Sequence, residues 1–356
     1  MIVTILAFIF VLGVVVFFHE LGHFLMAKAS GVRVYKFSLG FPPKMIGFKK
    51  GDTEYCISWI PLGGYVKMAG ENPVEGEELG DDPGSLMNKP AWKKALIFAA
   101  GPLANYFTAI IIATGLFFFL GKEQVDPERV VIGLIEENSP AAELGLKPGD
   151  VILSIAGNDV NQLRDIHEVV VDSPNQEFNI VWERNGQTMS AMIETAADTI
   201  PNYQGEMVAR GKIGIAQATD TIPVGVGEAF ILANRASWRV TVLMADIVQK
   251  LVTGRASPKI LGGPIMIAKV SGEKAREGFV SLLDLVVLIS INLAILNLLP
   301  IPILDGGHLL LLLIETVRRK PLTLKQKAIF QQVGLAILLA LMVMVFYNDI
   351  FNNLMG

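Results

Sequence analysis

The chain has 356 residues, of which 52% are hydrophobic and 18% are charged, and its formal net charge at pH 7 is −4. This composition indicates a membrane protein rather than a soluble enzyme, and the charge gives no reason to expect nucleic acid as a partner. Cys56 is the only cysteine, so no disulfide forms within the chain. We interpret it as an ordinary small apolar residue.

Four stretches are apolar and long enough to cross a bilayer, which takes about 20 residues of helix. They are residues 1–27, 95–121, 282–315 and 328–348. The third stretch is interrupted by the residues PIPILDGG. The first lacks the basic start and the small-residue cleavage site of a signal peptide. We therefore expect it to remain in place as a transmembrane helix.

Lys and Arg gather in residues 28–94, after the first stretch, and in residues 318–327, between the third and the fourth. Loops on the cytoplasmic side of a membrane carry an excess of these residues. The pattern predicts that both segments are cytoplasmic. Both termini and residues 121–281 are then expected on the outer side of a bacterial cytoplasmic (inner) membrane.

The end of the first stretch carries the motif HELGH, with His19, Glu20 and His23. On a helix, His19 and His23 share one face because they are four residues apart. The pattern H-E-x-x-H binds zinc through its histidines and uses the glutamate as a general base. A chance match is the alternative, but ionisable side chains in an apolar span are costly and mark a functional interior. We predict a zinc site with Glu20 as the base.

A catalytic zinc takes three protein ligands and keeps one position open, so a third ligand must come from elsewhere in the chain. Asp305 in NLLPIPILDGGH is the candidate, because Pro300 and Pro302 break the third stretch just before it. Irregular backbone at membrane depth is tolerated only inside the protein or beside a wet cavity. His308 is a rival third ligand. We favour Asp305, since a further ligand would close the open position.

Several motifs follow one another along the chain: FHELGHF, PLGGYVKM, AGPLAN, GGPI and SINLAILNLLPIPILDGGH. In these motifs and their order the chain resembles the site-2 protease family of intramembrane zinc metalloproteases, most closely its bacterial RseP-type members. The resemblance covers nearly the whole chain. It implies four transmembrane helices, one Zn²⁺ held by His19, His23 and Asp305, and Glu20 as the base that activates water.

Five residues are expected to contact substrate. The resemblance implies this role for Asn292 and Asn297, although asparagine in a membrane helix otherwise favours helix packing. The other three, Gly63, Gly64 and Tyr65, lie in CISWIPLGGYVKMAG, which predicts a strand at residues 56–60, a turn, and a second strand from Tyr65. In the family such a sheet dips into the membrane beside the active site, where an unwound substrate can add a strand. An ordinary soluble hairpin is the alternative.

The acidic residues 71–85 predict a loop.

Residues 127–217 change to an α/β pattern, and RVVIGLIEENSPAAELGLKPGDVILSIAGNDV resembles a PDZ domain. Longer relatives have two such domains and this chain has one. His167, within it, is interpreted as a surface histidine.

Residues 218–281 contain two helical patterns. Charged residues in the first of them, including Arg235 and Asp246, argue against a fifth span, so we expect amphipathic helices on the outer membrane surface.

These observations predict a polytopic α-helical membrane protein with a cytoplasmic-side membrane-associated β-sheet and an extracytoplasmic PDZ domain. The predicted function is zinc-dependent intramembrane endopeptidase, which cleaves transmembrane segments of single-span membrane proteins such as anti-sigma factors or signal-peptide remnants. Its partners would be these substrates, the lipid bilayer, and a peptide or C-terminus at the PDZ domain. The alternative is a catalytically silent membrane receptor or quality-control scaffold, but a pure binder has no need of Glu20.

Overall fold

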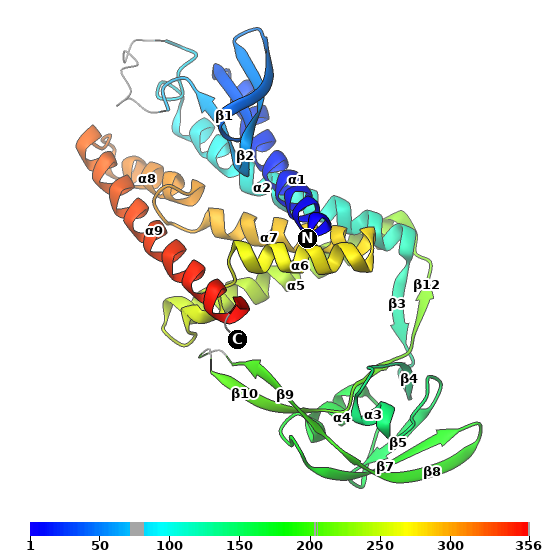
Figure 1. Cartoon of the computed structure of the whole chain (residues 1–356). Coiled ribbons are helices and arrows are strands. Elements are labelled where there is room, and N and C mark those ends of the chain that lie inside the picture. The colour runs from blue at the N-terminus through cyan, green and yellow to red at the C-terminus, as the bar shows by residue number, and fades with distance from the viewer. Residues whose placement is uncertain (72–81, 203, 205, 355–356) are drawn as a thin grey trace. The chain divides into compact units, whose positions relative to one another are not determined.

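A computed structural model describes residues 1–71, 82–202, 204 and 206–354 (Figure 1). Most of the loop predicted at residues 71–85 therefore lies outside the described residues. The chain divides into two compact units. The first comprises Met1–Leu116, Val226–Val252 and Leu261–Gly356, and the second comprises Phe117–Gly225 and Thr253–Ile260.

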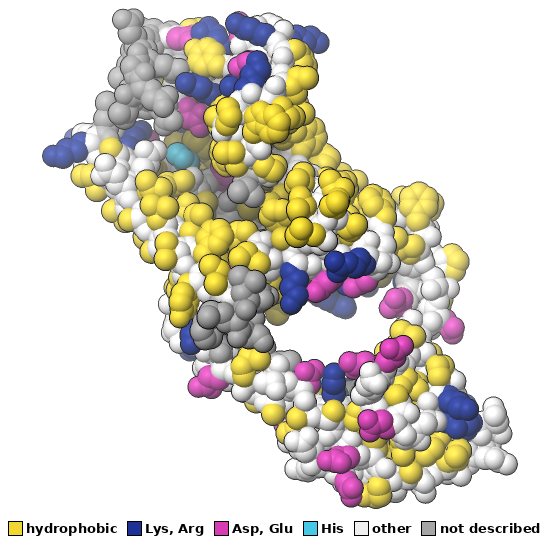
Figure 2. Space-filling model, viewed as in Figure 1, with side chains coloured by type: hydrophobic (Ala, Val, Ile, Leu, Met, Phe, Trp, Pro, Cys, Tyr) yellow, Lys and Arg dark blue, Asp and Glu magenta, His cyan; other side chains and the backbone are white. Residues whose placement is uncertain are grey.

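The first unit is mostly helical. Its helices are α1 (Ile2–Ala29), α2 (Ala91–Leu120), α5 (Val226–Val252), α6 (Pro264–Glu277), α7 (Phe279–Leu298), α8 (Asp305–Arg318) and α9 (Leu324–Leu354). Within the described part of the chain, four helices are long and apolar enough to cross a membrane: Ile2–Ala29, Ala91–Leu120, Phe279–Leu298 and Lys325–Ile350. Each overlaps one of the four predicted stretches, the third of them only over residues 282–298 of the predicted 282–315, and α5 is not among them. Figure 2 shows hydrophobic side chains gathered over these helices, with Lys and Arg side chains at the end formed by strands β1 and β2.

Helices α1 and α2 each bury one face. The buried residues of α1 recur at every fourth position, namely Ala7, Val11, Val15, His19, His23 and Ala27. The buried residues of α2 include a similar series, Ile97, Gly101, Asn105, Ala109 and Ala113. Residues four apart lie on one side of a helix, so the two predicted metal ligands of α1 continue its packing face. The helices approach closely at Gly22, where an added Cβ would lie 2.3 Å from the Ala100 carbonyl oxygen.

The third predicted stretch is not a single helix. Helix α7 ends at Leu298, and α8 begins at Asp305 after a turn that contains Pro300 and Pro302. Proline cannot continue a helix, so the break occurs where the sequence predicts it. The turn is tight, because a Cβ on Gly306 would lie 2.2 Å from the Leu299 carbonyl oxygen. Helices α1 and α7 pack against each other through Ala7, Val11, Val15, Leu282, Leu285 and Val286.

Strands β1 (Val34–Lys50) and β2 (Thr53–Met68) form an antiparallel sheet. The turn predicted at residues 61–64 is wrong: these residues belong to β2, and the connection between the strands lies at residues 51–52. Glycine also serves where backbone must come close to another group, and this is its use here. A Cβ on Gly63 would lie 2.5 Å from the Phe41 ring. The register shifts along the sheet, so that Leu39 lies opposite both Ile57 and Gly64.

The second unit has its own sheet and core. Its helices are α3 (Pro140–Glu143) and α4 (Leu163–Val170), and its strands are β3 (Lys122–Val125), β4 (Val130–Ile135), β5 (Val151–Ile155), β6 (Asn158–Asp159), β7 (Glu177–Arg184), β8 (Gln187–Glu194), β9 (Ala196–Pro201), β10 (Met207–Lys212), β11 (Ile215–Gln217) and β12 (Thr219–Ile222). The main sheet has the order β11-β4-β5-β7-β8, with β6 beside β5. Ile132, Ile152, Ile180 and Trp182 are among the residues of its core. His167 on α4 is exposed, as predicted.

Candidate metal centre

His19, His23 and Asp305 come together inside the first unit. The Nε2 atoms of His19 and His23 are 3.3 Å apart. The Asp305 carboxylate lies 3.4 Å from Nε2 of His19 and 3.3 Å from Nε2 of His23. Among the described residues, these three are the group of histidine and acidic side chains that could hold a metal ion. The HELGH motif and the aspartate motif, almost 300 positions apart in the sequence, thus meet at one point.

The dimensions of this group suit zinc. Zinc bonds to imidazole nitrogen and carboxylate oxygen are about 2.0–2.2 Å long and tetrahedrally arranged, which places neighbouring ligand atoms roughly 3.3–3.5 Å apart. The three separations given above fall in this range. Two imidazoles and one carboxylate also form a donor set known from catalytic zinc sites, and three ligands leave the fourth position open. The group therefore fits a catalytic zinc ion rather than a closed structural site.

Helix α2 supports both imidazole rings from behind. Nδ1 of His23 lies 2.8 Å from the backbone oxygen of Ile97, to which it donates a hydrogen bond when Nε2 faces the metal. Nδ1 of His19 lies 3.5 Å from the side-chain amide of Asn105. Between these contacts, Gly101 leaves space for the His23 ring, because a Cβ there would lie 2.2 Å from Nε2. The residues of α2 that face α1 therefore shape the site.

A pocket of about 220 Å³ opens at the three residues and is large enough to admit water. Glu20, Gly64, Tyr65 and Asn297 line it with them. A Cβ on Gly64 would lie 2.8 Å from Cγ of Glu20, so β2 touches the side chain of the predicted base. Strand, base and metal-binding group therefore share one cavity.

The two predicted asparagines differ in position. The amide nitrogen of Asn297 lies 3.4 Å from Nε2 of His19. Asn292 does not line the pocket in the described part of the chain, and its buried side-chain oxygen has no hydrogen-bond partner there. Gly63 does not line the pocket either and packs on the Phe41 ring.

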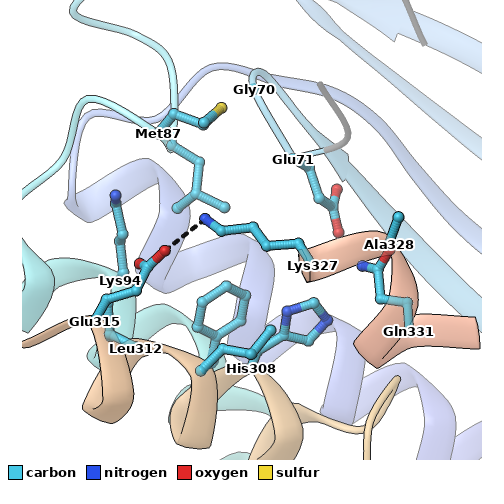
Figure 3. Close-up of a pocket in the computed structure, with 13 residues that line it drawn as sticks. Gly70, Glu71, Met87, Lys94, His308, Leu312, Glu315, Lys327, Ala328 and Gln331 are labelled. Atoms are coloured by element: carbon cyan, nitrogen blue, oxygen red, sulfur yellow. Dashed lines mark ion pairs between the residues drawn. The ribbon is translucent and has the colours of Figure 1, made fainter. Parts of the chain in front are cut away.

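His308, the rival ligand, stands apart from the group of three. Its ring stacks on Phe98 with 4.8 Å between centroids. It lines both the metal pocket and a second cavity, drawn in Figure 3. There Glu315 pairs with Lys327 at 2.9 Å, and Lys94 lies nearby. His308 thus lies between the metal pocket and a cavity with charged walls.

Four features of the site were missed by sequence reasoning: the Ile97 carbonyl, Gly101, Asn105 and Glu71. Glu71 lines both cavities. A backbone carbonyl gives no signal in a sequence, and Glu71 lay in a stretch that looked like an acidic loop. Asn105 did carry a signal, since it is a polar residue in the middle of an apolar span.

The chain matches known proteins along nearly its whole length. Residues 7–341 match the model of peptidase family M50. The regulator of sigma-W protease RasP of Bacillus subtilis is 31% identical over 423 residues, which cover 98% of this chain and 98% of the relative. The zinc metalloprotease RasP of Oceanobacillus iheyensis is 30% identical over 424 residues, with the same two coverages.

Solved structures match a smaller part of the chain. The PDZ domain of the SdrC-like protein from Listeria monocytogenes covers 26% of this chain and 92% of its own, with 21% identity and a TM-score of 0.21. The family model, by contrast, spans far more than half of the chain, and the two relatives align with it almost from end to end. The chain therefore belongs to peptidase family M50.

Proposed function

We propose that the protein is a zinc-dependent intramembrane endopeptidase that cleaves transmembrane segments of single-span membrane proteins. The observation that carries this proposal is the pocket in which His19, His23 and Asp305 meet beside Glu20. Two of these ligands lie on a helix long and apolar enough to cross a membrane. A hydrolytic centre in such a helix is suited to peptide bonds that lie within the bilayer.

In the proposed mechanism, His19, His23 and Asp305 would hold a zinc ion, which would polarise the scissile carbonyl and lower the pKa of water toward 7. Glu20 takes the proton from the attacking water and passes it to the leaving amine. Glu20 lines the pocket next to Gly64, which supports this role. Asn297 directs an amide N–H toward the negative charge that develops on the carbonyl oxygen, as an oxyanion donor does.

A substrate helix must unwind before attack, because its peptide bonds are shielded by their own hydrogen bonds. We propose that the unwound segment pairs with β2 next to the metal, where Gly64 and Tyr65 line the pocket. Backbone pairing of this kind supplies affinity without requiring one particular sequence. Exposed apolar side chains on the sheet, such as Ile46, Phe48 and Trp59, support its contact with lipid.

We further propose that the active site lies near the cytoplasmic face of a bacterial inner membrane. Lys44, Lys49 and Lys50 on β1 support this orientation through the positive-inside rule. The second unit and both termini would then be extracytoplasmic, with a PDZ-type domain that binds a peptide or C-terminus. Helix α5 would lie along the outer membrane surface.

The substrate class follows from the site and from one relative's name. A relative is named regulator of sigma-W protease, which supports a role in regulated intramembrane proteolysis of proteins such as anti-sigma factors. Signal-peptide remnants would meet the same chemistry. A catalytically silent receptor or scaffold is disfavoured, because it has no use for a carboxylate beside an open metal position.

The test uses purified full-length protein in detergent and a fluorescent single-span model substrate. The Glu20→Gln variant is expected to keep its zinc, measured by elemental analysis, and to cleave roughly 10²–10⁴-fold more slowly. Glu137→Gln, at an exposed position of the second unit, is the matched control and should cleave like the wild type. Cleavage that survives in Glu20→Gln, or after removal of all metal, would refute the mechanism.

Orientation is tested separately with single cysteines in a Cys56→Ala background. Lys49→Cys and Glu137→Cys both lie at exposed positions. A membrane-impermeant thiol reagent should label Glu137→Cys in cells with a permeable outer layer and an intact inner membrane. It should label Lys49→Cys only after the inner membrane is opened. The opposite pattern would invert the proposed orientation while leaving the catalytic proposal untouched.

A further inference from the structure

We infer that Asn105 is a positioning residue for the metal centre, which holds the ring of His19 through Nδ1. This inference rests on the proposed function, since it assumes that His19 binds zinc through Nε2. Asn105 is the last residue of the motif AGPLAN and has no part in the proposed mechanism. The structure places that side chain directly behind a metal ligand.

A histidine that binds a metal through Nε2 carries a hydrogen on Nδ1, and an acceptor for this hydrogen fixes the ring. His23 has such an acceptor in the backbone oxygen of Ile97, at 2.8 Å. His19 requires an equivalent partner. The side-chain group that reaches its Nδ1 is the amide of Asn105, at 3.5 Å.

The amide of Asn105 has an oxygen to offer. The residue is fully buried, and its Oδ1 has no hydrogen-bond partner among the described residues. Turning the amide by 180° exchanges oxygen and nitrogen at nearly unchanged shape. The oxygen then faces Nδ1 of His19 and accepts its hydrogen. A buried acceptor without a donor costs about 1–3 kcal/mol, and this contact gives the Asn105 oxygen its donor, while the amide nitrogen takes the place that the oxygen leaves.

The amide can serve the ring in both of its states. Without metal, His19 can carry its hydrogen on Nε2, and Nδ1 then accepts from the Asn105 nitrogen that now faces it. With metal on Nε2, the turned amide accepts from Nδ1. The Ile97 carbonyl can only accept, so it holds His23 in the metal-binding tautomer at all times. Asn105 is therefore the adaptable partner of the pair.

The position of Asn105 argues against a simple packing role. It belongs to the series of buried residues at every fourth position of α2, whose other members are Ile97, Gly101, Ala109 and Ala113. An apolar residue would fill this place without the cost of a buried amide. Asparagine in membrane helices commonly joins helices by hydrogen bonds. Here the hydrogen bond joins α2 to the metal ligand itself.

The test compares two variants of full-length protein with a control. Asn105→Leu keeps the approximate size of the side chain and removes its hydrogen bonds, whereas Asn105→Asp keeps an acceptor for Nδ1. Thr108→Val removes a different buried polar group from α2. Zinc affinity is measured by chelator competition, and ligand geometry by the visible absorption spectrum of protein loaded with Co²⁺.

Asn105→Leu should raise the zinc Kd about 10–100-fold, as loss of such outer contacts does, and should change the Co²⁺ spectrum. Asn105→Asp should stay within a few-fold of the wild type, and Thr108→Val should match it. The inference is overturned if Asn105→Leu keeps wild-type affinity and spectrum, if Asn105→Asp is equally weak, or if Thr108→Val falls as far. Failure of the wild type to bind zinc, or unchanged binding in His19→Ala, would instead remove the proposed metal site and this inference with it.

Discussion

A single methyl group added at Gly101 is expected to disable the metal centre without unfolding the protein. In Gly101→Ala, the new Cβ would lie 2.2 Å from Nε2 of His23 and 2.7 Å from its two neighbouring ring carbons. Non-bonded heavy atoms rest about 3.5–4.0 Å apart. The ring nitrogen must therefore move by roughly 1.3 Å or more.

The side chain of His23 can make this movement, because Nε2 is at its far end, but the metal site cannot follow. Metal–ligand distances tolerate changes of only about 0.2 Å, and a misplacement of about 1 Å commonly costs 10²-fold in rate. We expect a zinc Kd at least about 100-fold higher, which corresponds to roughly 2.7 kcal/mol. Alanine is itself favoured over glycine in helices by up to about 1 kcal/mol, so α2 should not be weakened.

The assay measures zinc affinity by chelator competition and substrate cleavage in the same preparation. Gly115→Ala is the matched control, since it makes the same change in the same helix at a place where the added Cβ meets nothing within 4 Å. It should behave like the wild type in both measurements. Thermal unfolding of the metal-free proteins should show that both variants are folded.

Wild-type zinc affinity in Gly101→Ala would refute this reasoning. It would mean that His23 does not bind the metal through Nε2, or that α1 and α2 can separate. The second explanation conflicts with the close contact at Gly22. Equal loss of zinc in Gly115→Ala would show that added methyl groups disturb α2 in general, and the argument from His23 would fail.

Three further predictions concern the base, the second unit and the metal. Gly64→Ala places a Cβ 2.8 Å from Cγ of Glu20. Cleavage should therefore fall about 10²-fold, while the zinc content stays unchanged. An equal loss of zinc would contradict the idea that Gly64 acts on the site through the Glu20 side chain. Arg184 donates two hydrogen bonds of 2.7 Å to the buried carboxylate of Asp150. Burial alone would raise the pKa of Asp150, but these bonds lower it. The stability they provide is present above the unfolded pKa of about 3.9 and is lost as the pH falls through the lower folded value. Asp150→Asn should therefore destabilise the second unit by about 3 kcal/mol at pH 7 and by less below about pH 4. Hydrogen exchange of the backbone amides in β5 and β7 measures this loss of stability. A loss that does not depend on pH would refute the stabilising role of the Asp150–Arg184 pair. A chelator should abolish cleavage and added Zn²⁺, but not Ca²⁺, should restore it, because the donor set suits zinc; restoration by Ca²⁺ would contradict this.

The long helices and the chemistry of the site could be predicted from the sequence, because both depend on local patterns. Apolar length sets where a helix can span a membrane, and the spacing of His19 and His23 sets their common face. Pro300 and Pro302 fix the break before Asp305 by excluding helical hydrogen bonds. The turn at residues 61–64 was mispredicted, because glycine marks both a turn and a close approach. Only the neighbouring Phe41 ring and Glu20 side chain distinguish the two cases.

What the sequence determined by itself is therefore the inventory: apolar spans, two histidines with a glutamate, and an aspartate at a helix break. What only the tertiary structure decided is which groups touch. Ile97, Gly101 and Asn105 face the histidines because α1 and α2 pack along buried faces with the same period of four. Such contacts depend on the distance and rotation between helices, which are set by packing of the whole unit and not by any one segment. For this reason, the contacts by which α2 supports the two histidine rings can be seen only in the folded chain.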